Sequence, residues 1–293
     1  MTVLVEKNVL VPMRDGVNLA ADVYRPSQDG RYPVLLQRTP YNKELWPITA
    51  LTLDPIRAAA AGYAVVIQDV RGRWASEGEW PLSRAVSTPW YLGTNGELAM
   101  SAAPLDTQPD NYIYDPNDPC PTCGGGILLP PQYSPGPVNQ APILTRRDVL
   151  AYTSVVLEND LEVTGEVSAV LYAATSGRDT DWIVKLCDVH PDGTTINVCD
   201  GIVRASVRDG VRRQLVEPNA VVRYAVSLWS TAMVFKAGHR LRLLITSSDF
   251  PRYDRNPNTG ELAHEATRLE PALQKVYRDA ERASHIVLPV VAR

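Results

Sequence analysis

The sequence lacks an uninterrupted apolar run long enough to enter a membrane. None of its hydrophobic segments approaches the roughly 20 residues that a helix needs to span a bilayer, although 45% of its 293 residues are hydrophobic. The first residues, Met1 to Lys7, also lack a basic stretch followed by an apolar one. We therefore expect neither a signal peptide nor a membrane anchor, and a globular chain with apolar material for one or two cores.

An excess of charge of one sign is also lacking. The 29 Lys and Arg residues nearly balance the 33 Asp and Glu residues, which leaves a net charge of −4. A nucleic-acid-binding protein normally carries a clear basic excess on one surface. We therefore exclude nucleic acid as a partner.

Cysteine is scarce, with four residues in the chain. Four are too few for a disulfide scaffold in a chain of this length, and no export signal is apparent, so we expect a cytoplasmic protein. Cys120 and Cys123 have the spacing of metal ligands, but Cys187 and Cys199 form no second close pair. We favour buried thiols over a four-sulfur zinc site.

The chain begins with the pattern of a β-hairpin. Two strand-like runs, residues 8–13 and 19–24, flank the dipeptide Asp15-Gly16. Asp-Gly between alternating runs is a strong signal for a tight hairpin turn. We therefore predict an antiparallel pair at the start of the chain.

A strand–helix–strand pattern follows the hairpin. Residues 32–37 and 63–69 are largely apolar, as in strands buried on both faces. Between them, Asp54 is an N-cap for a short helix over residues 56–61, with proline at its first position. This order predicts an α/β fragment over residues 1–80.

The remaining segment, residues 81–293, has a different pattern. Its apolar runs are short, rich in β-branched residues and separated by turn residues, whereas residues 104–142 are rich in proline and predict a long loop. Many short strands with turns between them predict an antiparallel sandwich. The expected strands cover residues 149–157, 161–174, 181–189, 195–207, 220–229, 239–246 and 285–291.

Both segments resemble the α/β-hydrolases that include cocaine esterase and the X-prolyl dipeptidyl-peptidases. The stretches of the first segment that carry the resemblance are 13–17, 21–26, 38–43, 68–73 and 76–78. Those of the second segment are 114–116, 124–125, 147–150, 163–165, 179–182 and 247–252. The resemblance implies an α/β-hydrolase N-terminal fragment over residues 1–80 and an all-β jelly-roll sandwich over residues 81–293. It also implies hydrolysis of a small-molecule ester or amide, such as an X-prolyl dipeptide bond.

The catalytic centre of such enzymes is not found. They use a serine on a G-x-S-x-G turn, followed by an acid and a histidine. This sequence contains no G-x-S-x-G, and its first histidine is His190. Near residues 78–81 the hydrolase-like pattern passes directly into the sandwich-like one, as after an internal deletion. We therefore identify no nucleophile, acid or base, and expect the chain to be inactive alone.

Tyr41 is the one active-site residue that the resemblance carries over. In cocaine-esterase-like enzymes the matching tyrosine donates its hydroxyl to the oxyanion hole, and losing one such donor costs about 3 kcal/mol of transition-state stabilisation. The alternative for Tyr41 is an aromatic residue packing in a turn beside Pro40. Asp69, Arg71 and Arg73 are expected to hold a loop at a strand end.

Other polar residues have simple structural interpretations. Ser27 and Ser76, the serines of the first segment, lie in polar turns and are poor nucleophile candidates. The four histidines, His190, His239, His264 and His285, are scattered in the sequence, and we expect structural roles for them. We expect no cofactor and no metal.

Two groups of aspartates have residue types that could form a site. Asp179, Asp181 and Asp188 could form a glycosidase pair, but strand alternation argues against it. Asp110, Asp115 and Asp118 could hold calcium, although Asx turns explain the same residues.

A second class of function is a non-catalytic binding or assembly module. Jelly rolls commonly bind ligands, and Trp90, Trp182 and Trp229 could form an aromatic platform if they were exposed together. The alternative is that they pack in the core. An α/β fragment with few strands also leaves apolar faces uncovered, so a homo-oligomer is the candidate assembly.

Overall fold

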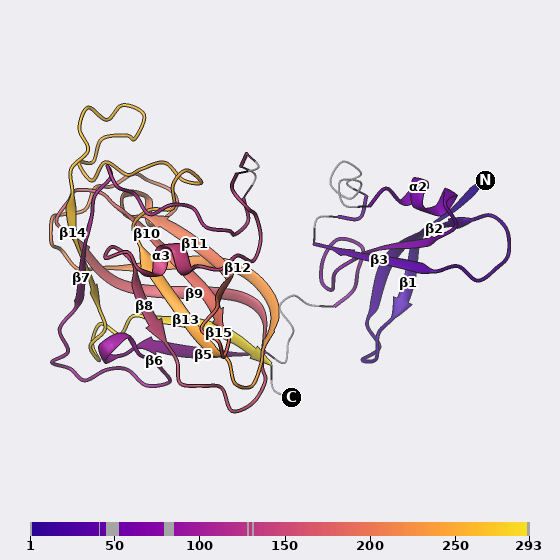
Figure 1. Cartoon of the computed structure of the whole chain (residues 1–293), viewed down its shortest axis with the longest axis horizontal. Helices are drawn as coiled ribbons and strands as arrows, with labels where there is room; N and C mark the ends of the chain where they lie inside the picture. Colours follow the sequence, from indigo (N-terminus) through magenta and orange to yellow (C-terminus); the bar gives the residue numbers. More distant parts are fainter. Residues whose placement is uncertain are drawn as a thin grey trace. The chain divides into compact units, whose positions relative to one another are not determined.

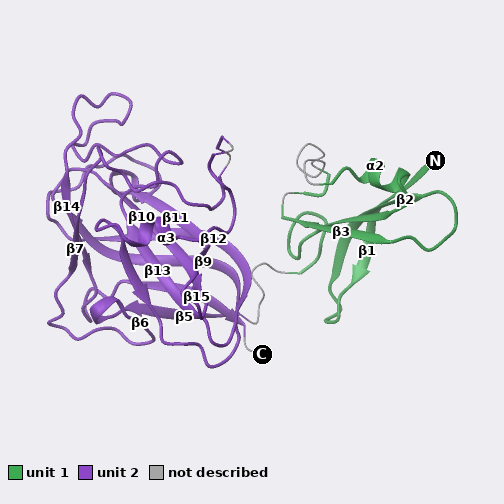
Figure 2. Ribbon diagram, in the orientation of Figure 1, with its two compact units in different colours: residues 1–83 green, residues 84–293 purple. Residues whose placement is uncertain are grey.

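The computed structural model describes residues 2–40, 42–44, 53–78, 85–127, 129–130 and 132–291. The chain divides into two compact units, Met1–Ser83 and Arg84–Arg293, and each is considered by itself (Figure 2). Within the described ranges, no helix is long and apolar enough to cross a membrane.

The first unit is a four-stranded sheet with the strand order β1-β2-β4-β3. Strands β1 (Val3–Pro12) and β2 (Asn18–Pro26) pair antiparallel and form the predicted hairpin. Gly16 has a φ of +83°, a backbone conformation that glycine adopts without strain, which explains why the turn lies there. The hairpin prediction is confirmed.

The strand–helix–strand prediction is confirmed as well. Strands β3 (Val34–Thr39) and β4 (Ala64–Asp69) pair parallel, and helix α2 (Pro55–Ala60) lies between them in the chain. The Asp54 carboxylate accepts a hydrogen bond from the Arg57 backbone N–H at 3.0 Å, as an N-cap does.

Strand β3 has the composition of a strand buried on both faces, but one of its faces is exposed, as expected for a fragment with few strands. Val34 and Leu36 are 63% and 54% exposed, whereas Leu35 between them packs against the core. The reason is that the cluster containing Ala59 of α2 packs on the Leu35 side of β3, whereas no apolar cluster of the described residues includes Val34 or Leu36. The core cluster of this unit is small: Tyr24, Ala59, Val65 and Ile67 are buried in it, and Leu19, Ala20 and Ala21 are buried outside it.

The second unit consists of two sheets whose named strands all pair antiparallel (Figure 1). The four-stranded sheet has the order β11-β10-β13-β8, with β8 (Leu150–Thr153), β10 (Asp181–Val189), β11 (Thr195–Arg204) and β13 (Arg240–Thr246). The seven-stranded sheet has the order β6-β5-β15-β9-β14-β7, and β12 also pairs with β9. Its strands are β5 (Ala85–Leu92), β6 (Leu98–Ala99), β7 (Asp110–Tyr114), β9 (Leu161–Thr175), β12 (Val222–Phe235), β14 (Ala272–Tyr277) and β15 (His285–Val291).

One hydrophobic core joins the two sheets. Trp182, Leu186 and Leu243 contribute to it from the four-stranded sheet, and Tyr224 and Ile286 from the seven-stranded one. Apolar residues from both sheets meet in this cluster, which makes the unit an antiparallel sandwich as predicted. The short elements outside the sheets are α3 (Ala141–Leu144) and the 3₁₀ turns Thr94–Gly96 and Ala205–Val207.

All seven strands expected in this unit are present, but β5, β6, β7 and β14 were not predicted. Pro89 lies inside β5, and β7 lies in the proline-rich stretch that was predicted to be a loop. Strand β7 reads Asp-Asn-Tyr-Ile-Tyr, in which Tyr112 and Tyr114 are buried while Ile113 is 63% exposed. Burial alternates along β7, but the polar residues and the exposed isoleucine give its sequence no matching alternation of apolar and polar residues.

Candidate functional site

The loop that carries Tyr41 is the first candidate, because Tyr41 is the site residue that the sequence singles out. Tyr41 itself lies outside the described residues. The turn after it is held by Asp69, the last residue of β4: the Lys43 backbone N–H donates to Oδ1 at 2.7 Å and Lys43 Nζ to Oδ2 at 2.9 Å. Both side chains are buried, with 2% and 0% exposure, so this ion pair fixes the turn firmly to the sheet.

The residue before Tyr41 is held from another segment. Trp74 Nε1 donates to the Pro40 carbonyl at 3.0 Å. Arg71 donates to both carboxylate oxygens of Asp15, at 2.9 and 2.7 Å, and this hydrogen bonding lowers the pKa of Asp15. These contacts agree with the expectation that Asp69 and Arg71 hold a loop.

Of the two serines in residues 1–80, Ser76 is the better placed, but its hydroxyl is fully engaged. It donates to the Asp69 carbonyl at 2.7 Å and accepts from the Ala20 N–H at 2.9 Å. Ser27 lies on an exposed turn. A serine nucleophile needs a base to take its proton, and residues 1–83 contain no histidine.

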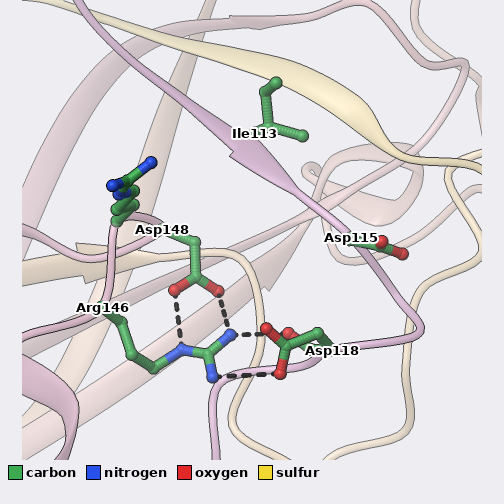
Figure 3. A pocket seen from close by; sticks show the side chains of 6 residues that line it. Ile113, Asp115, Asp118, Arg146 and Asp148 are labelled. Atoms are coloured by element: carbon green, nitrogen blue, oxygen red, sulfur yellow. Dashed lines mark hydrogen bonds and ion pairs between the residues drawn. The ribbon is translucent and has the colours of Figure 1, made fainter.

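In the second unit, a polar pocket of about 240 Å³ lies beside Arg146 (Figure 3). Arg146 donates through Nε and Nη2 to the two oxygens of Asp148, at 2.7 and 2.9 Å, and through Nη1 to Asp118 at 3.2 Å. The charges of Arg146, Asp118 and Asp148 satisfy one another. The arrangement joins the loop around Asp118 to the start of β8 and offers little to a ligand.

The calcium grouping considered from the sequence is not assembled. Asp110 forms an ion pair with Arg278 and accepts a hydrogen bond from Tyr152 at 2.6 Å. Asp115 accepts from its own turn, and Asp118 pairs with Arg146. The three carboxylates therefore have separate partners.

The glycosidase grouping is also dispersed. Asp179 accepts from the backbone and hydroxyl of Ser206, at 2.9 and 2.7 Å, and Asp181 is held by Arg204. Desolvation by burial raises the pKa of Asp181, and the Arg204 pairing opposes that shift. Asp188 has a third set of partners, described below.

The aromatic platform is not formed. Trp90 and Trp182 are 8% and 0% exposed and belong to the core, whereas Trp229 is 75% exposed. The core alternative therefore holds for two of the three tryptophans.

The cysteines follow the buried-thiol interpretation. Cys120 and Cys187 lie in one small buried cluster with Leu244, and burial raises the pKa of both thiols to about 12. Cys123 packs beside this cluster and is partly exposed.

A family-like stretch, residues 247–252, anchors the loop around Cys120. The Cys120 N–H donates to Ser248 Oγ at 2.8 Å, and Thr122 Oγ1 donates to the Asp249 carbonyl at 2.8 Å. The Asp249 carboxylate is itself buried and paired with the equally buried Lys185 at 2.7 Å. In this segment the family-like stretch 247–252 thus holds a long loop.

One cluster of polar side chains was not predicted from the sequence. Asp188, His190 and His239 come together at the end of the four-stranded sheet. His239 Nδ1 lies 2.9 Å from Asp188 Oδ1, and His190 Nε2 lies 3.5 Å from Asp188 Oδ2. Of the other histidines, His264 is largely exposed and His285 contacts the Ala283 carbonyl at 2.7 Å.

A signal for this cluster was present in the sequence. Asp188 and His190 are two residues apart and so lie on one face of an extended chain, while His239 begins another predicted strand. The pairing of these two strands, which places His239 opposite His190, could not be read from the sequence.

Comparison with known proteins gives two family matches. Residues 56–287 match the model of the X-Pro dipeptidyl-peptidase C-terminal non-catalytic domain, and residues 15–88 match that of the X-Pro dipeptidyl-peptidase (S15 family).

Two curated relatives match a large part of this chain. Cocaine esterase from Rhodococcus sp. is 41% identical over 248 residues, which are 80% of this chain and 43% of the esterase. A putative serine esterase from Mycobacterium bovis is 28% identical over 244 residues, which are 76% of this chain and 36% of that protein. The chain thus spans less than half the length of these relatives.

Solved structures share the fold at low sequence identity. An aminopeptidase from a marine sediment Thaumarchaeota archaeon has a TM-score of 0.68 at 17% identity, with coverage of 99% of this chain and 96% of that one. An α-amino acid ester hydrolase has a TM-score of 0.65 at 16% identity, with coverage of 98% and 96%. At these identities the likeness concerns the fold alone.

Proposed function

Since the chain belongs to the CocE/NonD and X-Pro dipeptidyl-peptidase family of hydrolases, we propose that it is a member without hydrolase activity of its own. In this proposal the opening strands of the hydrolase domain are joined directly to the C-terminal β domain, which works as a binding or assembly module. The family resemblance noted from the sequence is confirmed by these matches.

The proposal rests on the hydrogen bonds of Ser76 and on the lack of histidine in residues 1–83. The candidate serine, Ser76, has both hydrogen-bonding directions of its hydroxyl engaged by backbone groups, and the first unit contains no imidazole. Acyl transfer by a serine requires a base that removes its proton. The S15 match, which ends at residue 88, and the 43% share of the esterase's length support the same conclusion.

The finer assignments are parts of this proposal. The sandwich would be a jelly roll, as in the resembling enzymes, and Tyr41 would keep its oxyanion-hole position without a nucleophile beside it. An ester or amide, such as an X-prolyl bond, is the substrate class that a completed site would take. We also propose a cytoplasmic protein, supported by its four free cysteines.

Incubation with a fluorophosphonate probe followed by intact-mass measurement tests the proposal. We expect no adduct on the folded chain, because no serine is activated. A full-length serine esterase of the family, labelled in parallel, shows that the probe is competent. A single stoichiometric adduct, lost in Ser76→Ala or Ser27→Ala, would overturn the proposal and restore the acyl-hydrolase alternative.

A further inference from the structure

Three side chains that ligate metals meet at one end of the four-stranded sheet of the second unit. Asp188 is the penultimate residue of β10, His190 directly follows that strand, and His239 directly precedes β13. In the β10–β13 ladder Asp188 pairs with Leu241 and Val189 with Arg240, so His190 and His239 are the next pair in register. Their rings lie 4.6 Å apart.

The donor atoms are spaced as a small metal ion requires. One ligand atom from each of the three residues lies within 4.8 Å of the others. In a tetrahedral site with metal–ligand bonds near 2.0–2.1 Å, donor atoms are about 3.3 Å apart. The separations from Asp188 Oδ2, 3.0 Å to His239 Nδ1 and 3.5 Å to His190 Nε2, lie on either side of that value.

The charges also favour a cation. The Asp188 side chain is 5% exposed, and a buried carboxylate needs a positive partner. Among the described residues, no lysine or arginine forms an ion pair with Asp188; its contacts are the two imidazoles. The nearby guanidiniums of Arg240 and Arg242 instead donate to neutral oxygens, at Ser154, Thr153 and Thr195.

The backbone holds both histidines in place without a metal. The His190 N–H donates to the Thr194 carbonyl at 2.8 Å and its carbonyl accepts from Gly193 at 2.9 Å, which closes the turn after β10. The His239 N–H donates to Lys236 at 3.0 Å and its carbonyl accepts from Leu157 at 2.8 Å. Three ligands on anchored backbone lose little freedom when they bind an ion.

We propose that Asp188, His190 and His239 form a site for a divalent transition-metal ion with the ligand preference of zinc. Two imidazoles and one carboxylate suit such ions, whereas calcium and magnesium prefer sites built from oxygen ligands. His190 is 42% exposed, so the ion can enter from solvent and keep an open coordination position. A pocket of about 480 Å³ lined by His190, Arg240 and Arg242 adjoins this position and suits a water molecule or a small anion as the fourth ligand.

Titration of the full chain with CoCl₂, followed by displacement with ZnCl₂, tests the site, because cobalt reports its coordination in the visible spectrum. We expect one equivalent of cobalt with the weak bands of a nitrogen–oxygen site and no thiolate charge-transfer band, and full displacement by one equivalent of zinc. MgCl₂ and CaCl₂ should not displace the cobalt.

His190→Gln is the decisive variant, because His190 is partly exposed and its loss leaves the sheet intact. It should weaken zinc binding by at least about tenfold, whereas His264→Gln, on an exposed loop, should leave binding unchanged. Cys123→Ser should also leave it unchanged, which separates this site from the thiols near Cys120. Absence of a stoichiometric cobalt complex, or binding that persists in His190→Gln, would overturn the proposal and leave the histidines as hydrogen-bond partners of Asp188.

Discussion

At the scale of single residues, the buried charges of this chain hold loops. Lys43 and Asp69 anchor the turn after Tyr41, and Lys185 and Asp249 lie under the loop around Cys120. A buried ion pair gives little net stability, but breaking one is costly because it leaves an unpaired charge in the interior. These pairs therefore determine where the two loops lie.

The thiols of Cys120 and Cys187 give a prediction at this scale. Burial raises their pKa to about 12 from an ordinary value of 9.0. At pH 8 both should resist a thiol reagent in the folded chain, while the partly exposed Cys123 reacts first and all four cysteines react in urea. Equal rates for Cys120, Cys187 and Cys123 in the folded protein would contradict the buried-thiol assignment.

The same shifts predict the direction of alkaline destabilisation. Between about pH 9 and pH 12 the folded chain keeps thiol protons that the unfolded chain loses, so the folded state binds more protons. The contribution of the two thiols to stability is thus complete below pH 9 and is lost as the pH rises toward 12. Urea unfolding across this range should show a steeper fall for the natural chain than for Cys120→Ala/Cys187→Ala.

At the scale of elements, strand β3 is unusual because it exposes large apolar side chains. It ends its sheet and carries Val34 and Leu36 on an uncovered face, while Leu35 points to the core. An exposed apolar edge strand is a site for association between chains. In the described part of the chain, β4 is the only strand that pairs with β3, and no apolar cluster includes Val34 or Leu36.

Substitution on β3 tests this interpretation. Val34→Lys/Leu36→Lys should lower the aggregated fraction measured by light scattering without unfolding the unit, because both side chains face solvent. Leu35→Lys, the neighbouring control, should unfold the first unit, because it places a charge against Tyr24 and Val65. Unchanged aggregation in the double variant would place the associating surface elsewhere.

At the scale of the whole molecule, two cores of very different size share one chain. Among the described residues, the core cluster of the sandwich holds 26 buried apolar residues, whereas that of the first unit holds four. A small core can offset little of the conformational entropy lost on folding. The two units should therefore differ in stability.

Calorimetry tests that difference. We expect two transitions, a small one at lower temperature from residues 1–83 and a larger cooperative one from residues 84–293. The variant Ala59→Asp, which disrupts the smaller core, should remove the first transition and leave the second unchanged. A single transition that carries the heat of the whole chain would show instead that the units unfold together.

Local sequence patterns were sufficient to predict the position of many helices, strands and turns. The Asp15-Gly16 turn, the Asp54 cap and seven strands of the sandwich were predicted correctly, because turn residues, caps and apolar periodicity act over a few neighbours. Strand β7 was missed because its polar residues and exposed Ile113 concealed the alternation. The family, too, could be identified from the sequence, since its characteristic stretches are short and contiguous.

Only the tertiary structure decided which residues meet. It separated the carboxylates at Asp110, Asp115 and Asp118 and brought His239 to Asp188 and His190 across paired strands. It also left Leu36 in solvent, although the composition of β3 suggested burial. Such outcomes depend on strand order, register and the presence of a covering layer, which are set by contacts between distant parts of the chain and have no local signature.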